Sequence, residues 1–290
     1  MKLVRTISDI REQVARARAG GRTIGLVPTM GFLHEGHLSL VDRCRELSDY
    51  VVMSIYVNPL QFAPNEDFGS YPRDLERDLA AAEQRGVDLV FTPDDRQLYP
   101  GKPAVAVTPR RLNDRLCGLG RPTHFEGVLT VVAKLFGIVR PDVAVFGQKD
   151  FQQAVLIEKM VTDLDMPVRV DVAPTVRESD GIAMSSRNAY LTKEQRARAR
   201  NLSRGLAAAV AAFRAGERAV ERLRSVILQT MEAAGGVDVE YVEIVSAHEL
   251  EPAETAGDDT VAAVAARVGS TRLIDNVRLA RPDPGLAKLL

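Results

Sequence analysis

This chain of 290 residues has few cysteines and almost no net charge. Its only cysteines are Cys44 and Cys117, too few for a disulfide framework, and Cys44 falls in the apolar helical spacing of segment 40–47. We therefore expect two free thiols, as in the cytosol. The 38 basic and 39 acidic side chains nearly cancel, so no global charge would attract nucleic acid or an anionic membrane. Small molecules are the favoured partners.

Long hydrophobic runs are also missing. The most apolar stretch, Val128 to Val139, is interrupted by Lys134 and is too short to span a bilayer. The first 19 residues carry charges throughout and contain no apolar segment of the kind that a secretory signal needs. We expect a soluble, cytoplasmic protein with no membrane partner.

The first part of the chain alternates between two hydrophobic periods. Short β-rich runs alternate with segments of helical period, such as Leu38 to Leu47 and Leu75 to Arg85. This alternation predicts a doubly wound, Rossmann-like α/β domain, in which helices connect the strands of a parallel sheet and ligands bind at the strands' carboxyl ends. The predicted strands are Ile24 to Val27, Val51 to Val57, Val87 to Phe91, Val143 to Phe146 and Val168 to Val172.

The pattern changes after the last of these strands. Thr192 to Ala215 and Val220 to Ala233 have the composition of helices, and Gly235-Gly236 then introduces alternating segments. Because 290 residues are comfortable for two domains, we predict a larger α/β domain over residues 1–176 and a smaller C-terminal α+β domain over residues 177–290. The later strands are predicted at Val239 to Val245, Thr260 to Val268 and Arg272 to Ile274, and a weakly ordered tail at Arg281 to Leu290.

The most informative segment is Pro28-Thr29-Met30-Gly31-Phe32-Leu33-His34-Glu35-Gly36-His37, which follows a predicted strand and precedes a helical pattern. Taken alone, the pair His34 and His37 is equally typical of surface histidines at a helix start, of metal ligands and of phosphate contacts. Context favours phosphate, because the segment holds half of the chain's four histidines and its glycines allow a ligand to approach the backbone.

Three further polar clusters follow predicted strands or turns, and each by itself is also typical of an ordinary loop. The first lies where a strand meets a helix and contains Lys149 and Asp150. The second adds two hydroxyls and a guanidinium, and the third supplies neutral amides suited to a small hydroxy acid. They are Phe146 to Gln153, Met184 to Asn188, and Asn58, Gln61 and Tyr71. Arg121, Thr123 and His124 form a weaker set before another helical run.

Together these motifs carry a specific resemblance. Pro-Thr-Met-Gly-x-Leu-His-x-Gly-His, Asn-Pro-x-Gln-Phe, Phe-Gly-x-Lys-Asp-x-Gln-Gln and Met-Ser-Ser-Arg-Asn occur in this order between Pro28 and Leu191. The chain resembles the pantothenate synthetase (pantoate–β-alanine ligase) family, part of the nucleotidyltransferase group that shares the His-x-Gly-His signature with class I aminoacyl-tRNA synthetases. Phe32 departs from the family pattern, in which smaller residues are common at that position.

The resemblance implies the ATP-dependent joining of pantoate to β-alanine through an enzyme-bound pantoyl adenylate, with release of AMP and pyrophosphate. It implies Mg²⁺ as the metal, a homodimer formed through the larger domain, and nucleotide and pantoate binding by that domain. The C-terminal domain would act as a lid. The residue that holds the β-alanine carboxylate stays open, with Arg121 and Arg187 as hypotheses.

The resemblance also implies roles for individual residues. His37 is catalytic, and we add His34 and Lys149 as contacts to the transferring phosphate and its neighbours. The pantoate site would contain Gln61, Gln153 and Asn58, and Gln61 would also lie near β-alanine. The ATP site would contain Met30, Gly31, Phe32, Leu33, His34, Glu35, Gly36, His37, Gly147, Gln148, Lys149, Asp150, Val176, Met184, Ser185, Ser186 and Arg187.

Two alternatives stay open on the sequence alone. Another nucleotidyltransferase of this fold would act on a phosphorylated acceptor, which calls for more basic residues than the loop 58–61 and Gln152-Gln153 offer. A non-catalytic ATP-binding regulator would be expected to lose the paired histidines or Lys149, all of which are present. AMP release that depends on the acceptor distinguishes these possibilities.

Overall fold

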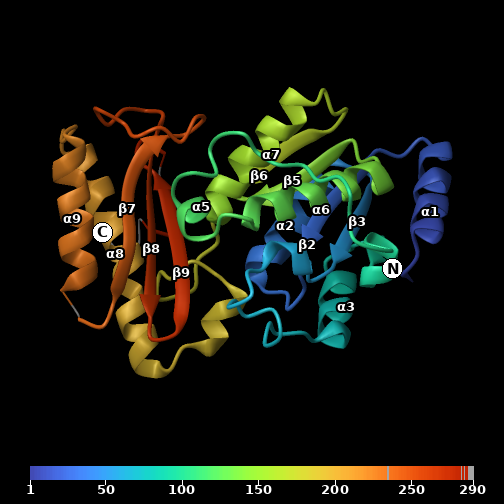
Figure 1. The fold of residues 1–290 in the computed structure, drawn as a ribbon, viewed down its shortest axis with the longest axis horizontal. Coiled ribbons are helices and arrows are strands. Elements are labelled where there is room, and N and C mark those ends of the chain that lie inside the picture. The colour runs from blue at the N-terminus through green and yellow to red at the C-terminus, as the bar shows by residue number, and fades with distance from the viewer. Residues whose placement is uncertain (234, 282, 284, 287–290) are drawn as a thin grey trace. The chain divides into compact units, whose positions relative to one another are not determined.

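A computed structural model of the chain describes residues 1–233, 235–281, 283 and 285–286 (Figure 1). Its contacts divide into two compact units. The first comprises Met1–Asp114, Gly118–Gly147 and Leu156–Ala173, and the second comprises Arg115–Cys117, Gln148–Val155 and Pro174–Leu290. The division lies close to the predicted boundary at Val176, but it also assigns two earlier segments to the second unit.

The first unit is built on a six-stranded sheet, and every strand pairing in it is parallel, as predicted. The spatial order β1-β4-β3-β2-β5-β6 reverses direction between β2 and β5. In doubly wound sheets this point is where ligands bind, beyond the strands' carboxyl ends. The strands are β1 (Lys2–Val4), β2 (Ile24–Thr29), β3 (Tyr50–Ile55), β4 (Leu89–Phe91), β5 (Val143–Gly147) and β6 (Arg169–Ala173).

The central strands are buried on both faces. Successive residues from Ile24 to Val27 are all buried, which requires cover on each side of β2. Val41 and Cys44 of the helix after β2 belong to a buried core cluster with residues of the sheet. The helices are α1 (Ile7–Ala19), α2 (Glu35–Leu47), α3 (Leu75–Gln84), α4 (Asp95–Leu98), α5 (Cys117–Gly120), α6 (His124–Val139) and α7 (Phe151–Asp163), with 3₁₀ turns η1 (Pro59–Gln61) and η2 (Gln148–Asp150).

The second unit packs two helices with a three-stranded antiparallel sheet of order β7-β8-β9 (Figure 1). Its core joins Leu206, Leu223 and Ile227 of the helices to Val264 of the central strand. A Cβ at Gly205 would lie 3.0 Å from Ile227 O, so glycine permits the close approach of the two helices. The elements are the 3₁₀ turn η3 (Ser186–Tyr190), α8 (Lys193–Arg214), α9 (Val220–Glu232), β7 (Asp238–Ser246), β8 (Thr260–Val268) and β9 (Thr271–Arg278).

Two local predictions for this unit differ from the structure of the described residues. The strand predicted to end at Ile274 continues through Asp275 and Asn276 to Arg278, because buried hydrogen bonds override the poor strand propensity of these polar residues. Within the predicted tail, Leu286 is buried in the core and Asp283 forms an ion pair. Pro282, Pro284 and residues 287–290 of that tail lie outside the described residues. None of the described helices has the length and hydropathy needed to cross a membrane.

Candidate active site

The loop that leaves β2 turns sharply before α2 begins. Thr29 Oγ1 donates to Ser54 O on β3 (2.8 Å) and accepts from Gly31 N (3.2 Å). Gly31 and Phe32 both have positive φ angles, +80° and +50°. The left-handed conformation is accessible to glycine and costly for phenylalanine, so the turn needs support from elsewhere in the fold.

Asp78 on α3 provides that support, and the sequence analysis missed it. Its carboxylate oxygens accept hydrogen bonds from Phe32 N and Leu33 N, both at 2.7 Å. The residue is 1% exposed, and burial raises its pKa more strongly than the two N–H donors lower it. An acidic residue 46 positions after the loop, on the apolar side of an ordinary helix, gives no local sign of this role. In the structure the role is visible, because a carboxylate is buried at a cost and accepts two main-chain hydrogen bonds from the loop.

The two histidines occupy the first turn of α2. His34 is the N-cap residue, and its carbonyl accepts from His37 N (2.8 Å). The imidazole rings lie with centroids 4.0 Å apart, and both residues are partly exposed. A helix N-terminus carries partial positive charge and attracts anions, so the paired rings lie where a phosphate would be stabilised.

Gln61, predicted from the sequence as a pantoate contact, lies against the same loop. Its Nε2 donates to Met30 Sδ (2.9 Å), and its Oε1 accepts from Asn58 Nδ2 (3.2 Å). Asn58 also donates to Gly127 O (3.0 Å) and accepts from Tyr99 OH (3.0 Å). These bonds engage both ends of the Asn58 carboxamide, and one of them is to Gln61.

A glycine in α6 lets this loop pack closely. A Cβ at Gly127 would lie 2.3 Å from Leu60 O and 2.6 Å from Gln61 N, closer than any side chain tolerates. The main chain of Gln61 is also fixed, because its carbonyl lies 2.8 Å from His124 Nδ1 and accepts from Arg121 (3.2 Å). Nothing in the sequence pattern distinguished this glycine from one in an ordinary helix.

Arg121 forms an ion pair with another side chain of this protein. Its Nε and Nη2 donate to the two carboxylate oxygens of Glu66 at 2.5 and 2.6 Å. Burial would raise the pKa of Glu66, but Arg121 more than offsets this, and the pKa lies below its usual value. The ion pair makes Arg121 a poor candidate for the β-alanine carboxylate and places it among the residues that support Gln61.

In the second unit, Lys149 lies in η2, two residues after β5 ends. Its Nζ lies 3.6 Å from Asp150 Oδ1, and its side chain is 21% exposed. Gln152 and Gln153 follow on α7 and have different surroundings. Gln152 is buried, and its Oε1 accepts from Cys117 N (2.9 Å) while its Nε2 donates to Arg115 O (2.8 Å). Gln153 is partly exposed. Only Gln153 is therefore available to a ligand.

The other predicted ATP-site segment of this unit is a short hairpin followed by a turn. Met184 N donates to Val176 O (2.9 Å), and Arg177 and Ala183 form an antiparallel bridge, so the structure brings Val176 and Met184 together. Ser185 then caps η3, accepting from Arg187 N through its side chain (3.3 Å). Ser186 is largely buried, and Ser185 and Arg187 are partly exposed.

A substitution at Asp78 tests how far it controls the histidine loop. Asp78→Ala leaves two buried N–H groups without their acceptor, which costs about 1–3 kcal/mol for each group. We expect faster hydrogen exchange in residues 30–34 than in the wild type. Asp74→Ala is the matched control on the same helix, because Asp74 caps α3 through Arg77 N (3.1 Å) and does not hold the loop. Equal effects of the two substitutions on residues 30–34 would contradict the assignment.

The fold and the loop together define a class: a doubly wound α/β protein in which the helix after β2 has an N-terminus suited to an anion. Comparison with known proteins gives the family. The profile of the pantoate-beta-alanine ligase family matches residues 2–278. The chain belongs to this family.

Individual relatives agree over nearly the whole length. The chain is 54% identical to a pantothenate synthetase of Pelotomaculum thermopropionicum over 96% of this chain and 99% of that one. A pantothenate synthetase crystal structure from Thermus thermophilus has a TM-score of 0.93 at 42% identity and covers 97% and 100% of the two chains. A ligase structure from Francisella tularensis, described as complexed with beta-gamma ATP and beta-alanine, has a TM-score of 0.78 at 30% identity over 97% and 99%.

Proposed function

We propose that this chain catalyses the ATP-dependent condensation of (R)-pantoate with β-alanine to pantothenate, AMP and pyrophosphate, in the cytoplasm. The observation that carries the proposal is the pair of histidines at the start of α2, in a chain whose residues 2–278 match the pantoate-beta-alanine ligase family. The Francisella relative described with ATP and β-alanine supports two of the three substrates.

In the first half-reaction the pantoate carboxylate attacks the α-phosphorus of ATP, and pyrophosphate leaves in line. Catalysis then consists mainly of positioning the reactants and neutralising the charge that develops on the phosphate oxygens. We assign that neutralisation to His34 and His37, helped by the partial positive charge of the α2 N-terminus. Lys149, Ser185, Ser186 and Arg187 bind the β- and γ-phosphates.

Pantoate is held by carboxamides in this proposal. Gln61 and Gln153 donate to its carboxylate and exchange hydrogen bonds with its hydroxyl groups, and Gln61 also lies near the incoming amine. Asn58, predicted as a pantoate contact, acts through Gln61, whose Oε1 it holds at 3.2 Å. A neutral set of donors and acceptors suits a substrate whose single negative charge is consumed when the adenylate forms.

The second half-reaction needs no protein nucleophile. The neutral amine of β-alanine attacks the acyl carbonyl of the adenylate, a new amide bond forms, and AMP leaves with the electron pair of the broken acyl–oxygen bond. The amine's excess proton passes to solvent. Groups that orient the two substrates therefore suffice for this step.

The cysteines are expected to be dispensable for both steps. Cys44 is fully buried in α2, and burial raises its pKa to about 11, so its thiol is protonated at neutral pH. The variant Cys44→Ser/Cys117→Ser should keep the wild-type turnover of each folded molecule and lose only packing stability. Steady-state AMP formation, normalised by active-site titration, measures this. An acyl-enzyme trapped on either thiol would contradict it.

Mg²⁺ belongs to the proposal as part of the nucleotide substrate. In the part of the chain that the structure describes, no cluster of three or more His, Cys, Asp or Glu side chains could hold a metal ion. Mg²⁺ in nucleotide-dependent enzymes is commonly held by substrate phosphates and water with only one or two carboxylates, and Asp150 is a carboxylate beside the proposed phosphate ligand Lys149. When bound, Mg²⁺ would neutralise charge on the β- and γ-phosphates.

The larger arrangement is proposed on the family resemblance. Residues 1–176 bind nucleotide and pantoate, residues 177–290 act as a lid that excludes water from the labile adenylate, and two copies form a homodimer. Solution scattering that is unchanged by ATP plus pantoate would count against the lid. Sedimentation at the mass of a single chain would count against the dimer.

The central test supplies the protein with ATP, Mg²⁺, pantoate and β-alanine and follows AMP and pantothenate. Omitting β-alanine should limit AMP release while pyrophosphate still forms once per active site, since the adenylate stays bound. A phosphorylated alcohol in place of pantoate should give no product. Absence of AMP with all four components present would refute the proposed function.

A further inference from the structure

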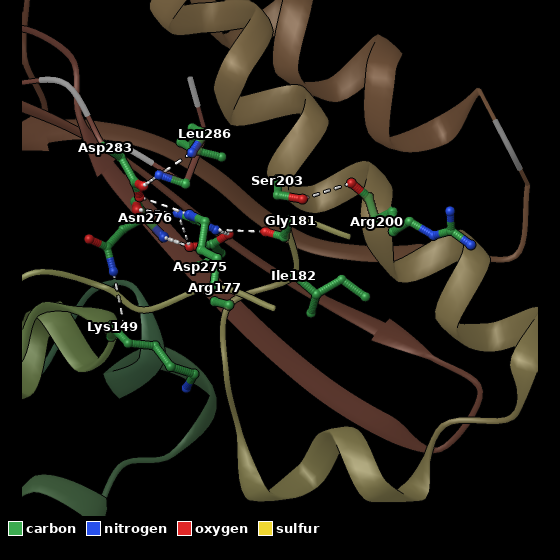
Figure 2. A network of polar contacts seen from close by, with 12 residues as sticks. Lys149, Arg177, Gly181, Ile182, Arg200, Ser203, Asp275, Asn276, Asp283 and Leu286 are labelled. Atoms are coloured by element: carbon green, nitrogen blue, oxygen red, sulfur yellow. Dashed lines mark hydrogen bonds and ion pairs between the residues drawn. The ribbon is translucent and has the colours of Figure 1, made fainter. Parts of the chain in front are cut away.

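The second unit contains a buried polar network that the proposed reaction does not use directly (Figure 2). Its centre consists of Arg177 on the hairpin 176–184 and of Asp275 and Asn276 on β9. The side chains of Arg177 and Asp275 are 2% and 3% exposed, and Asn276 as a residue is 2% exposed. Polar groups buried this deeply are retained only with complete hydrogen bonding, and here they bond to the main chain of proposed phosphate-site segments.

Asn276 is joined to η2 by three hydrogen bonds. Its Nδ2 donates to Gln148 O and to Lys149 O, both at 2.9 Å, and its Oδ1 accepts from Gln148 Nε2 (3.2 Å). These bonds fix the main-chain carbonyls of Gln148 and Lys149 and the side chain of Gln148, and so hold the turn on which Lys149 lies. Figure 2 shows Asn276 pointing toward the Lys149 main chain.

Arg177 holds Asn276 and the hairpin together. Its Nη1 and Nη2 donate to the two Asp275 oxygens at 2.6 and 3.0 Å, and Asp275 Oδ1 accepts from Asn276 N (2.7 Å). Arg177 Nη1 also donates to Gly181 O (3.2 Å) at the turn of the hairpin that leads into Met184 and Ser185. One guanidinium therefore links the hairpin that leads to Ser185 with β9, and β9 in turn bonds to η2 through Asn276.

We propose that Asn276 is a positioning residue for adenylate formation, which acts through Lys149 and is oriented by Asp275 and Arg177. The inference rests on the phosphate-binding role assigned to Lys149 under the proposed function. Its physical basis is that a misplacement of about 1 Å in a charged group facing a transition state costs up to roughly a hundredfold in rate. The three hydrogen bonds from β9 prevent such a displacement of η2.

The test measures single-turnover pyrophosphate formation from Mg-ATP and pantoate, with the burst amplitude counting competent enzyme. Asn276→Ala should lower the rate constant by roughly ten- to a hundredfold, with little change in the KM for β-alanine. Asn201→Ala is the matched control: Asn201 is a buried asparagine of the same unit, 5% exposed, and bonded to Arg204 on α8. It should lower thermal stability and leave the rate constant within about twofold.

A double-mutant cycle with Lys149→Ala separates positioning from simple loss of stability. If Asn276 acts through Lys149, adding Asn276→Ala to Lys149→Ala should cause almost no further loss of rate. Losses that multiply, or an Asn276→Ala enzyme with the wild-type rate constant and only a smaller burst, would overturn the inference and leave the proposed function standing. A wild-type rate constant for Lys149→Ala alone would refute the role assigned to Lys149 and the inference with it.

Discussion

Replacement of His37 by alanine is expected to lower the rate of adenylate formation by roughly a hundredfold or more, because a single donor to a transition-state oxyanion is commonly worth about 3 kcal/mol. His37 lies in the first turn of α2 with its ring 4.0 Å from that of His34, centroid to centroid. The contact is made as charge develops, so kcat and kcat/KM for ATP should fall together. Rapid-quench measurement of pyrophosphate release without β-alanine gives the rate directly.

His248→Ala provides the control for this prediction. His248 is 68% exposed and lies 3.3 Å from Asp259 on the surface of the second unit. Its loss should leave the adenylation rate within about twofold, as for most surface substitutions. If His37→Ala and His248→Ala had the same rate, the phosphate contact assigned to the histidine pair would be wrong. A raised KM for ATP at unchanged kcat would instead make His37 a ground-state binding residue.

The second large effect is expected on stability. Arg177→Met should destabilise the second unit by about 3–5 kcal/mol, because it leaves the buried carboxylates of Asp275 and Asp283 without their counter-charge. Burial acts to lower the pKa of Arg177, but the two aspartates more than offset it and hold the pKa above its usual value. Methionine fills similar volume, so the lost charge dominates. Hydrogen exchange of the β7, β8 and β9 amides reports the unfolding free energy of this unit.

Arg224→Met is the matched control for charge removal. Arg224 is 47% exposed and lies 3.9 Å from both Glu221 and Glu243. Exposed pairs at such distances contribute about 0–1 kcal/mol, so this variant should exchange almost as the wild type does. A similar loss of protection in both variants would mean that the buried network contributes no more than a surface pair.

Most of the fold was predictable because its signals are local. The alternation of apolar strands with helical segments predicted the parallel sheet, and the Gly235-Gly236 break predicted that further strands follow, which the structure pairs antiparallel. The predicted strand ends at Ile274, four residues before β9 ends, since Asp275-Asn276 has the composition of a turn. The polar pair stays in the strand because its hydrogen-bond partners come from residues more than 90 positions away.

The sequence by itself determined the class of the protein and the motifs proposed for its phosphate site, because motifs and secondary-structure patterns consist of residues that are neighbours along the chain. Only the tertiary structure decided how those motifs are held. Asp78 binds the histidine loop across 45 and 46 positions, and Asn276 binds the Lys149 turn across 127 and 128. Both bond to main-chain groups, which are present whatever the residue type, so the loop sequences give no indication of these distant partners.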